Sequence, residues 1–191
     1  MIWWPNEIPT LQYGRITLRR PVQEDVEPIF EACQDPLIPR YTTVPSAYTI
    51  LHAQNYVDRT QESLELEREL PFVISFDSAD GMKFAGVVSL HTINTHNHCA
   101  EIGYWMHPSM RGQGIATTAA KMITNLGITS IGFRRIEGVV DTDNIASQKL
   151  LIKAGFEREG VLKKKVTRED GSQIDMVVLA ATSDTWKEME S

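Results

Sequence analysis

The chain has 191 residues, of which 42% are hydrophobic and 23% are charged, and its formal net charge at pH 7 is −6. These values are ordinary for a folded globular protein, and the length suits one domain with an ample core. The acidic balance, in which Lys163-Lys164-Lys165 is the longest basic run, argues against nonspecific binding to nucleic acid or to an anionic membrane.

Cysteine content and the N-terminal residues indicate a cellular location. Two cysteines, Cys33 and Cys99, are too few for a disulfide framework. Residues 1–5 are apolar but lack the basic flank, the long apolar region and the cleavage site of a signal peptide. No run reaches the length of a transmembrane helix. We therefore expect a cytoplasmic protein without a membrane partner.

The first part of the chain predicts one strand and two helices. Residues 15–19 alternate between polar and apolar side chains, as in a strand. Residues 26–33 place apolar side chains at i, i+3, i+4 and i+7, which is one face of a helix. The proline-containing segment 36–39 breaks the chain. Ser46 is the expected cap of a second helix, whose apolar stripe covers residues 53–64.

A meander of three strands is expected next. The apolar runs 72–76 and 84–90 read as strands, and the turn-forming segment 77–81 separates them. A second polar turn, 94–98, leads into a third strand-like run at 100–106. Consecutive strands joined by short turns pair in antiparallel fashion.

The last part of the chain alternates helices and strands. An apolar stripe over 115–126 predicts a helix, and residues 136–140 predict the next strand, parallel to the one before the helix. Residues 144–154 form a further helix with an asparagine at its start and a glycine after its end. Residues 156–166 and 174–180 complete the chain as a hairpin.

Residues 111–116, between a predicted strand and a predicted helix, are the most informative segment. Unpaired backbone N–H groups gather at a helix N-terminus, the helix dipole favours an anion there, and glycines allow close approach. The segment therefore predicts a phosphate-binding loop. It is not a Walker loop, because Gly114 is followed by Ile115-Ala116, and it meets the dinucleotide fingerprint only in part.

The pattern Arg/Gln-x-x-Gly-x-Gly/Ala in this segment resembles the pyrophosphate loop of the GNAT acyl-CoA transferases. The element order β-α-α-β-β-β-α-β-α-β-β is also that of the GNAT family, and residues 144–156 resemble its motif B. The resemblance covers about residues 14–181 of a single domain, 1–191. It implies an α+β GNAT acyl-CoA N-acyltransferase fold: a mostly antiparallel sheet of about seven strands, one splayed parallel pair and about four flanking helices.

Four details resemble more closely the RimJ/RimL-like ribosomal-protein N-acetyltransferases. They are Glu-Ile-Gly-Tyr-Trp at 101–105, Asn-x-x-Ser at 144–147, Gly-Phe-x-x-Glu-Gly at 155–160 and Asp-Gly at 170–171. The resemblance implies direct transfer of an acetyl group from acetyl-CoA, the co-substrate, to a primary amine in a ternary complex without a metal. The acceptor, a protein N-terminus or a small-molecule amine, stays open, as does the oligomeric state, with a homodimer as one option.

The resemblance also implies how CoA is bound. The backbone near Met106 would pair with the pantetheine, and the amides of the glycine loop would hold the pyrophosphate. Asn144 is expected to cap its helix and to touch CoA. The predicted CoA-binding residues are Met106, Arg111, Gly112, Gln113, Gly114, Ile115, Ala116, Thr117 and Asn144.

Acetyl transfer requires a neutral amine, a donor to the thioester carbonyl and a proton for the leaving thiolate. Glu101 is the first candidate base, because a carboxylate inside an apolar strand is costly unless it is used or paired. The alternative is an exposed or ion-paired strand glutamate. Glu159 is a second candidate, which could hold a catalytic water or the amine; its alternative is a charged strand end. Which of the two is the base stays open.

Ser147 is the candidate donor to the leaving thiolate. It lies on the buried side of its helix, since the residues at +3, +4 and +7 are apolar; the alternative is a first-turn serine that caps a helix N–H. Many GNAT enzymes carry a tyrosine seven residues after the motif-B asparagine, where this chain has Leu151, which favours the serine. Tyr104 points opposite to Glu101 by strand alternation and is interpreted as core or as a wall of the acetyl pocket.

Other readings remain beside the enzyme. The segment His96-Asn97-His98-Cys99 suggests a metal superficially, but no matching ligand pair exists elsewhere. A non-catalytic acyl-CoA-binding module or sensor would need the same loop, and a nucleotide-binding protein of another fold would bind ATP or NAD instead. Mutation of Glu101 or Ser147 separates the enzyme from the sensor, because only an enzyme would lose turnover while retaining CoA.

Overall fold

One mixed sheet of eight strands forms the centre of the computed structural model, which describes residues 2–168 and 170–189. The strand order is β1-β2-β3-β4-β5-β6-β8-β7, and every neighbouring pair is antiparallel except β5 and β6. The strands are β1 (Leu11–Tyr13), β2 (Ile16–Arg19), β3 (Glu69–Ser78), β4 (Gly81–Asn94), β5 (Cys99–Met106), β6 (Arg135–Asp141), β7 (Glu157–Thr167) and β8 (Gln173–Thr182).

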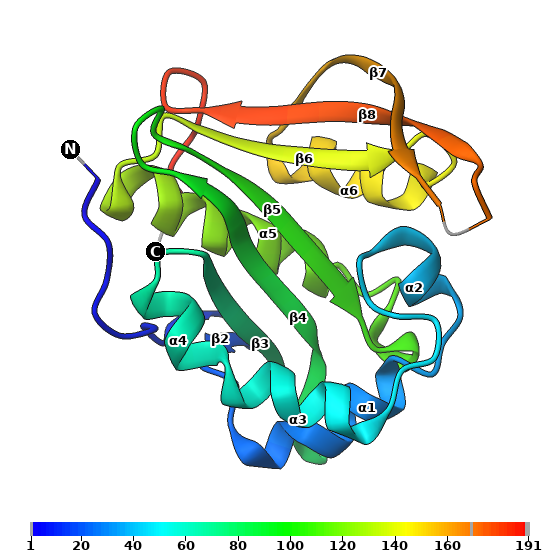
Figure 1. Cartoon of the computed structure of the whole chain (residues 1–191). Helices are drawn as coiled ribbons and strands as arrows, with labels where there is room; N and C mark the ends of the chain where they lie inside the picture. Colours follow the sequence, from blue (N-terminus) through cyan, green and yellow to red (C-terminus); the bar gives the residue numbers. More distant parts are fainter. Residues whose placement is uncertain (1, 169, 190–191) are drawn as a thin grey trace.

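Six α-helices in the described residues cover the two faces of this sheet (Figure 1). They are α1 (Val26–Ala32), α2 (Leu37–Tyr41), α3 (Ile50–Asp58), α4 (Thr60–Glu65), α5 (Ile115–Asn125) and α6 (Ile145–Ala154). Helix α5 packs against β4 and β5, and α6 packs against β6, β7 and β8 on the same face. Helices α1 and α3 pack against each other over the opposite face of β4.

Two apolar clusters hold these layers together. The larger one fills the space between the sheet and α5 and α6, with Ile115, Ile123 and Ile136 among its fully buried members. The smaller one lies under α1 and α3, where Ile29 and Ala53 are buried. Because both faces carry helices, the central strands bury side chains in both directions. Charged side chains are rare in such strands, so the few that occur there indicate a pairing or a function.

The predicted fold is confirmed, but two counts were too low. The described residues form eight strands and six α-helices where about seven and about four were expected. The additional strand, β1, has only three residues and pairs with β2 across a turn at Gly14, whose φ is +56°. A run this short carries too little alternation to be read from the sequence.

The additional helices arise in the segment between β2 and β3. Helix α2 contains Pro39 within its first turn, where a proline removes only an N–H that has no partner in the helix. The predicted cap at Ser46 was wrong: the helix starts at Ile50 with Thr49 as its cap. The stripe over 53–64 is interrupted at Arg59, which separates α3 from α4.

The parallel pair β5–β6 diverges, as expected. The two strands pair only at Cys99↔Arg135, Ala100↔Ile136 and Glu101↔Glu137, although β5 continues to Met106 and β6 to Asp141. Figure 1 shows the widening separation of the two ribbons, with α6 on one side. Beyond the last pair, the edge of β5 that faces β6 and the edge of β6 that faces β5 have no strand partner among the described residues. The backbone groups of such edges can pair with an extended ligand.

The end of β5 is held by an unusually close approach of β4, which yields a prediction. Gly86 has a φ of +153°, and a Cβ there would lie 2.3 Å from the carbonyl oxygen of Trp105. Gly86→Ala should therefore lower the free energy of unfolding by about 2 kcal/mol, because the new Cβ overlaps the backbone of β5 and the φ is unfavourable for alanine. Urea denaturation measures this change.

Gly160→Ala is the matched control, since Gly160 also lies in a strand but no atom stands within 4 Å of its Cβ position. This variant should change the free energy of unfolding by less than about 0.5 kcal/mol. Equal stability of the two variants would contradict the interpretation of Gly86.

Candidate active site

The glycine loop presents a set of backbone amides at the start of α5. Gly112 and Gly114 adopt left-handed φ values of +75° and +78°, and no atom lies within 4 Å of either Cβ position. The first amide bonded within the helix is that of Thr118, which donates to the carbonyl of Gly114 at 3.1 Å. Across the described chain, the amides of residues 112–117 find no acceptor. The loop thus fits an anion at the positive end of the helix dipole.

Arg111 has a structural position beside this loop. Its guanidinium donates to Asp35 in the turn after α1 at 2.5 Å and to the carbonyl of Met106 at 3.0 Å. Hydrogen bonds from the amide of Leu37 and from Arg111 lower the pKa of the Asp35 carboxyl. The side chain of Arg111 therefore ties the α1–α2 segment to the end of β5, and its own amide donates to Pro108 at 3.4 Å.

A hydroxyl pair links β5 to α6. Asn144 caps α6 as predicted, since its side chain accepts a hydrogen bond from the amide of Ser147 at 3.1 Å. The hydroxyl of Ser147 lies 2.6 Å from the hydroxyl of Tyr104 on β5. Burial raises the pKa of Tyr104 to about 12, so the phenol keeps its proton at neutral pH. Ser147 and Tyr104 together supply two hydroxyl groups at the divergence of β5 and β6.

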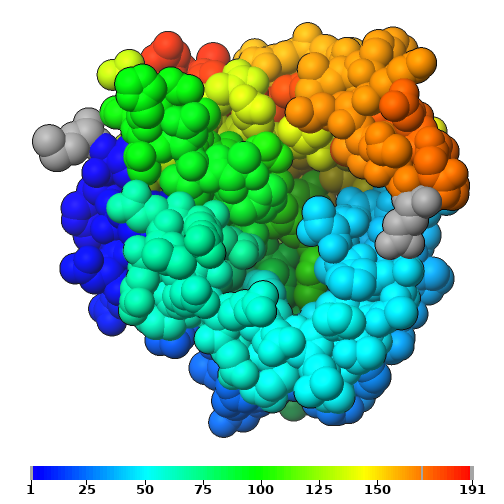
Figure 2. Space-filling view, in the orientation of Figure 1, coloured from blue at the N-terminus to red at the C-terminus, as the bar shows by residue number. Residues whose placement is uncertain are grey.

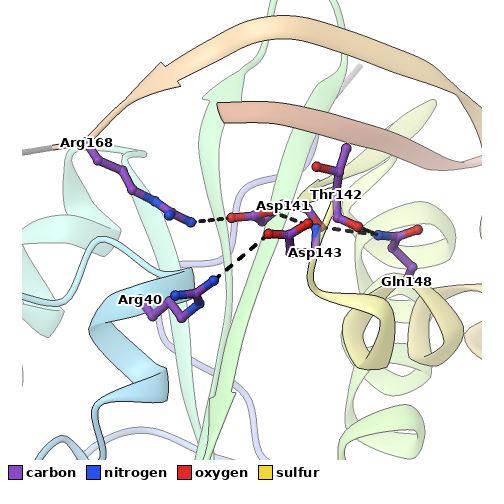
Figure 3. A network of polar contacts seen from close by, with 6 residues as sticks. All are labelled: Arg40, Asp141, Thr142, Asp143, Gln148 and Arg168. Atoms are coloured by element: carbon purple, nitrogen blue, oxygen red, sulfur yellow. Dashed lines mark hydrogen bonds and ion pairs between the residues drawn. The ribbon is translucent and has the colours of Figure 1, made fainter. Parts of the chain in front are cut away.

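The loop that presents Ser147 is fixed by a buried carboxylate at the end of β6 (Figure 3). Asp141 accepts a hydrogen bond from the amide of Asp143 at 2.8 Å and one from Arg168 at 2.5 Å. Gln148 on α6 donates to the carbonyl of Asp141 at 3.2 Å. These contacts join β6, α6 and the β7–β8 hairpin, so the first turn of α6 is held from three sides.

Glu101 lies on the other face of the sheet. Its side chain is half-buried. Trp105, four residues further along β5 and therefore on the same face, packs into the cluster under α1 and α3. Tyr104 packs into the cluster on the opposite face, as strand alternation predicted. Within the described residues the carboxylate of Glu101 makes no hydrogen bond. Figure 2 shows a hollow on this face, with green atoms of the central strands at its floor.

Glu159 has a different environment. Arg135 on β6 donates to both of its carboxylate oxygens, at 2.8 and 2.5 Å, and also donates to Glu137 at 2.6 Å. The hydrogen bonds from Arg135 lower the pKa of Glu159, so its charged form is favoured. A carboxylate engaged by a guanidinium is a weaker proton acceptor than one without a partner. The predicted role of Glu159 in catalysis stays a prediction.

No three His, Cys, Asp or Glu side chains within 2–168 and 170–189 gather as ligands for a metal ion. Cys33 is buried and Cys99 half-buried, and burial raises the pKa of the Cys33 thiol to about 12. In the same residues, every helix is too short or too polar to cross a bilayer.

Comparison with known families decides what this geometry belongs to. The model of the acetyltransferase (GNAT) domain matches residues 15–157. The chain belongs to the GNAT acetyltransferase family. It is therefore an acyltransferase, and the predicted family and enzyme class are confirmed.

Three relatives illustrate the range of this GNAT chain's neighbours. Uncharacterized N-acetyltransferase YoaA of Bacillus subtilis is 30% identical over 82% of the chain and 87% of that protein. The ribosomal-protein-serine acetyltransferase of Escherichia coli is 37% identical over 41% and 44% of the two chains. The spermidine N(1)-acetyltransferase of Escherichia coli is 34% identical over 50% of each.

Two solved structures are similar to the GNAT chain over most of its length. The microcin C7 self-immunity acetyltransferase MccE, in complex with acetyl-CoA and AMP, has a TM-score of 0.77, 25% identity, and coverage of 89% of this chain and 93% of that one. RimJ of Mycobacterium smegmatis, in complex with CoA-disulfide, has a TM-score of 0.76, 25% identity, and coverage of 88% and 82%. The acetyl-CoA complex supports acetyl-CoA as the co-substrate of this chain.

The sequence did not reveal the hydroxyl contact of Tyr104 or the partner of Arg111. It also did not reveal that His91 on β4 lies opposite Glu101 in the strand register. Tyr104 and Ser147 are 43 residues apart, and Arg111 and Asp35 are 76 apart. Strand alternation placed Tyr104 on the correct face, but no local pattern indicates a contact over such separations.

The hydroxyl pair yields a prediction for stability. Tyr104→Phe and Ser147→Ala each remove one partner, so each should lower the free energy of unfolding, and the double variant should lower it by less than the sum. We expect a coupling of about 1 kcal/mol, as for a net hydrogen bond, in a double-mutant cycle measured by urea denaturation. Tyr13→Phe is the control, because Tyr13 is exposed on β1. Additive effects of the two substitutions would show that the hydroxyls do not interact.

Proposed function

We propose that this protein is a RimJ/RimL-like N-acetyltransferase that moves the acetyl group of acetyl-CoA directly to a primary amine in a ternary complex. The observation that carries the proposal is the divergence of β5 and β6 after Glu101, with hydroxyl groups on one face and a carboxylate on the other. Two reactants that enter from opposite faces can meet there, and holding them in contact supplies much of the rate.

The proposed CoA-binding residues occupy the α5 side of this divergence. The amides of residues 112–117 would bind the pyrophosphate, because they lie at a helix N-terminus without acceptors of their own. The partnerless edge of β5 near Met106 would bind the pantetheine amides. Arg111 acts through its contacts with Asp35 and Met106, which hold the loop in position.

Ser147 is the proposed proton donor to the departing thiolate. A thiol has an ordinary pKa of about 8.5, so the thiolate leaves more easily when it receives a hydrogen bond or a proton. The hydroxyl of Tyr104, 2.6 Å from that of Ser147 and protonated at neutral pH, orients the serine and can replace its proton. This pair replaces the tyrosine that many GNAT enzymes carry where this chain has Leu151.

Glu101 is the proposed carboxylate on the acceptor side. It promotes removal of the proton of the amine, directly or through an intervening group, because its oxygens have no hydrogen-bond partner within the described residues. The net charge of −6 suits a cationic amine. The names of relatives include a ribosomal-protein-serine and a spermidine acetyltransferase, which support a protein N-terminus and a small polyamine as two candidate acceptors.

Ligand-dependent melting tests the proposed co-substrate. Acetyl-CoA and CoA should raise the melting temperature, because a ligand present at 100 times its Kd adds about 2.7 kcal/mol of stability. ATP and NAD should leave it unchanged. Thiol release on a panel of primary amines and N-terminal peptides then identifies the acceptor class. A shift with ATP or NAD alone would reject the proposal, and binding of CoA without thiol release from any amine would favour the sensor.

Substitution of the two proposed proton-handling residues tests the mechanism. Glu101→Gln and Ser147→Ala should each reduce kcat by about 10²-fold to 10⁴-fold, the usual contribution of general acid–base catalysis, and leave the Kd for CoA unchanged. Glu157→Gln, at an exposed strand position, is the matched control and should retain kcat. Glu159→Gln should have a smaller effect than Glu101→Gln; the reverse order would assign the base to Glu159.

A further inference from the structure

A histidine lies beside Glu101 on the neighbouring strand and on the same face of the sheet. His91 on β4 is the register partner of Glu101 on β5, and Glu69 on β3 is the register partner of His91. Directly paired residues place their side chains on the same face, so the imidazole shares the acceptor face with two carboxylates, one on each neighbouring strand. All three side chains are half-buried, and Glu137 on β6 continues the row beyond Glu101.

The imidazole ring is directed toward the divergence of β5 and β6. A Cβ at Gly103 would lie 2.7 Å from Nε2 of His91, so the ring occupies the space that a side chain at position 103 would need. Gly103 lies two residues beyond Glu101, which belongs to the last β5–β6 pair. The ring therefore reaches past Glu101 to the part of β5 that no longer pairs with β6.

The other ring nitrogen is held on β4. Nδ1 of His91 lies 2.9 Å from the hydroxyl of Thr92, which adopts a left-handed φ of +51°. A β-branched residue rarely takes this conformation, and here it accompanies the irregular register between His91 and Asn94. When Nδ1 donates to the threonine, the lone pair remains on Nε2. No acceptor or donor for Nε2 is found within residues 2–168 and 170–189.

We propose that His91 is the catalytic base that takes the proton of the attacking amine at Nε2, while Glu101 stabilises the imidazolium that results. The proposal rests on the proposed N-acetyltransferase function. The amine lone pair forms the C–N bond, and the N–H proton passes to Nε2. The C–S bond breaks, and its electron pair goes to sulfur, which takes a proton from the Ser147 hydroxyl. Solvent then removes the proton from His91 and, through the hydroxyl of Tyr104, restores that of Ser147.

Charged and polar groups on four strands and one helix surround the face on which the ring lies. Glu69 on β3 and Glu101 on β5 face the imidazole, Glu137 is next along the row, and Thr92 is its neutral partner on β4. Helix α3 contributes a neutral phenol, Tyr56, because burial and then the charge of Glu69 raise its pKa. A carboxylate on this face favours the positive charge that the ring gains when it takes a proton, and Glu101→Gln removes the carboxylate on β5.

The test compares His91→Gln with His96→Gln, a control in the exposed turn after β4. Kinetics use acetyl-CoA with spermidine or with a peptide that has an N-terminal serine. His91→Gln should lower kcat about 10²-fold to 10⁴-fold. In a plot of kcat against pH, it should also abolish the acidic limb, which is the fall in kcat toward low pH. The rise in melting temperature with CoA should be retained. His96→Gln should match the unsubstituted protein. Unchanged kcat and an unchanged acidic limb in His91→Gln would overturn the role of His91.

Two further measurements decide the question if His91→Gln does not fold. Gly103→Ala, whose Cβ would displace the ring, should lower kcat but retain the acidic limb. A ¹⁵N NMR spectrum of the histidine rings should show one ring whose signals move in Glu101→Gln; ring signals that are all unaffected by that substitution would overturn the pairing. Absence of thiol release from the unsubstituted protein with either amine would instead reject the proposed function itself.

Discussion

The separation of β5 from β6 after three residue pairs is the constraint on which the site depends. A continuous sheet would satisfy the backbone groups of both strands and leave no room for a ligand between them. At the point of separation, Gly138 on β6 keeps the strand close to α6, because a Cβ there would lie 2.4 Å from Leu151. The Leu151 side chain from α6 thus packs against β6 on one face where the two strands begin to separate. Beyond this point β5 and β6 no longer pair.

The two faces of the sheet carry different chemistry at this point. Hydroxyl groups of Tyr104 and Ser147 lie on the α5–α6 face, where burial keeps the phenol protonated. Carboxylate and imidazole groups of Glu101 and His91 lie on the α1–α3 face. The hydroxyl groups are therefore separated from the carboxylate and the imidazole by the sheet itself, as the proposed division into a donor side and an acceptor side requires.

Ion pairs on both sides hold the divergence in position. Arg111 connects the end of β5 to Asp35 in the segment between α1 and α2. Arg168 connects the β7–β8 hairpin to Asp141 at the end of β6 (Figure 3). Each pair joins a turn or a hairpin to the end of one of the separated strands. The sequence indicated a role in CoA binding for Arg111, but neither ion pair, because the partners are distant in the chain.

The sequence by itself determined the family, the order of the main elements and the position of the glycine loop before α5. These follow from local patterns: alternation in strands, 3.6-residue periodicity in helices, and the glycines before Ile115. It also placed Glu101 and Tyr104 on opposite faces of β5 and Ser147 on the buried side of α6. Each of these inferences needs only residues within one element.

Only the tertiary structure decided which side chains meet. The contacts of Tyr104 with Ser147, of Arg111 with Asp35 and of Glu159 with Arg135 join elements between 24 and 76 residues apart. The register that sets His91 opposite Glu101 depends on how β4 and β5 align, and a shift of one residue would turn the histidine to the other face. Periodicity specifies which face a residue takes, whereas register and packing specify its neighbour, and acid–base chemistry depends on the neighbour.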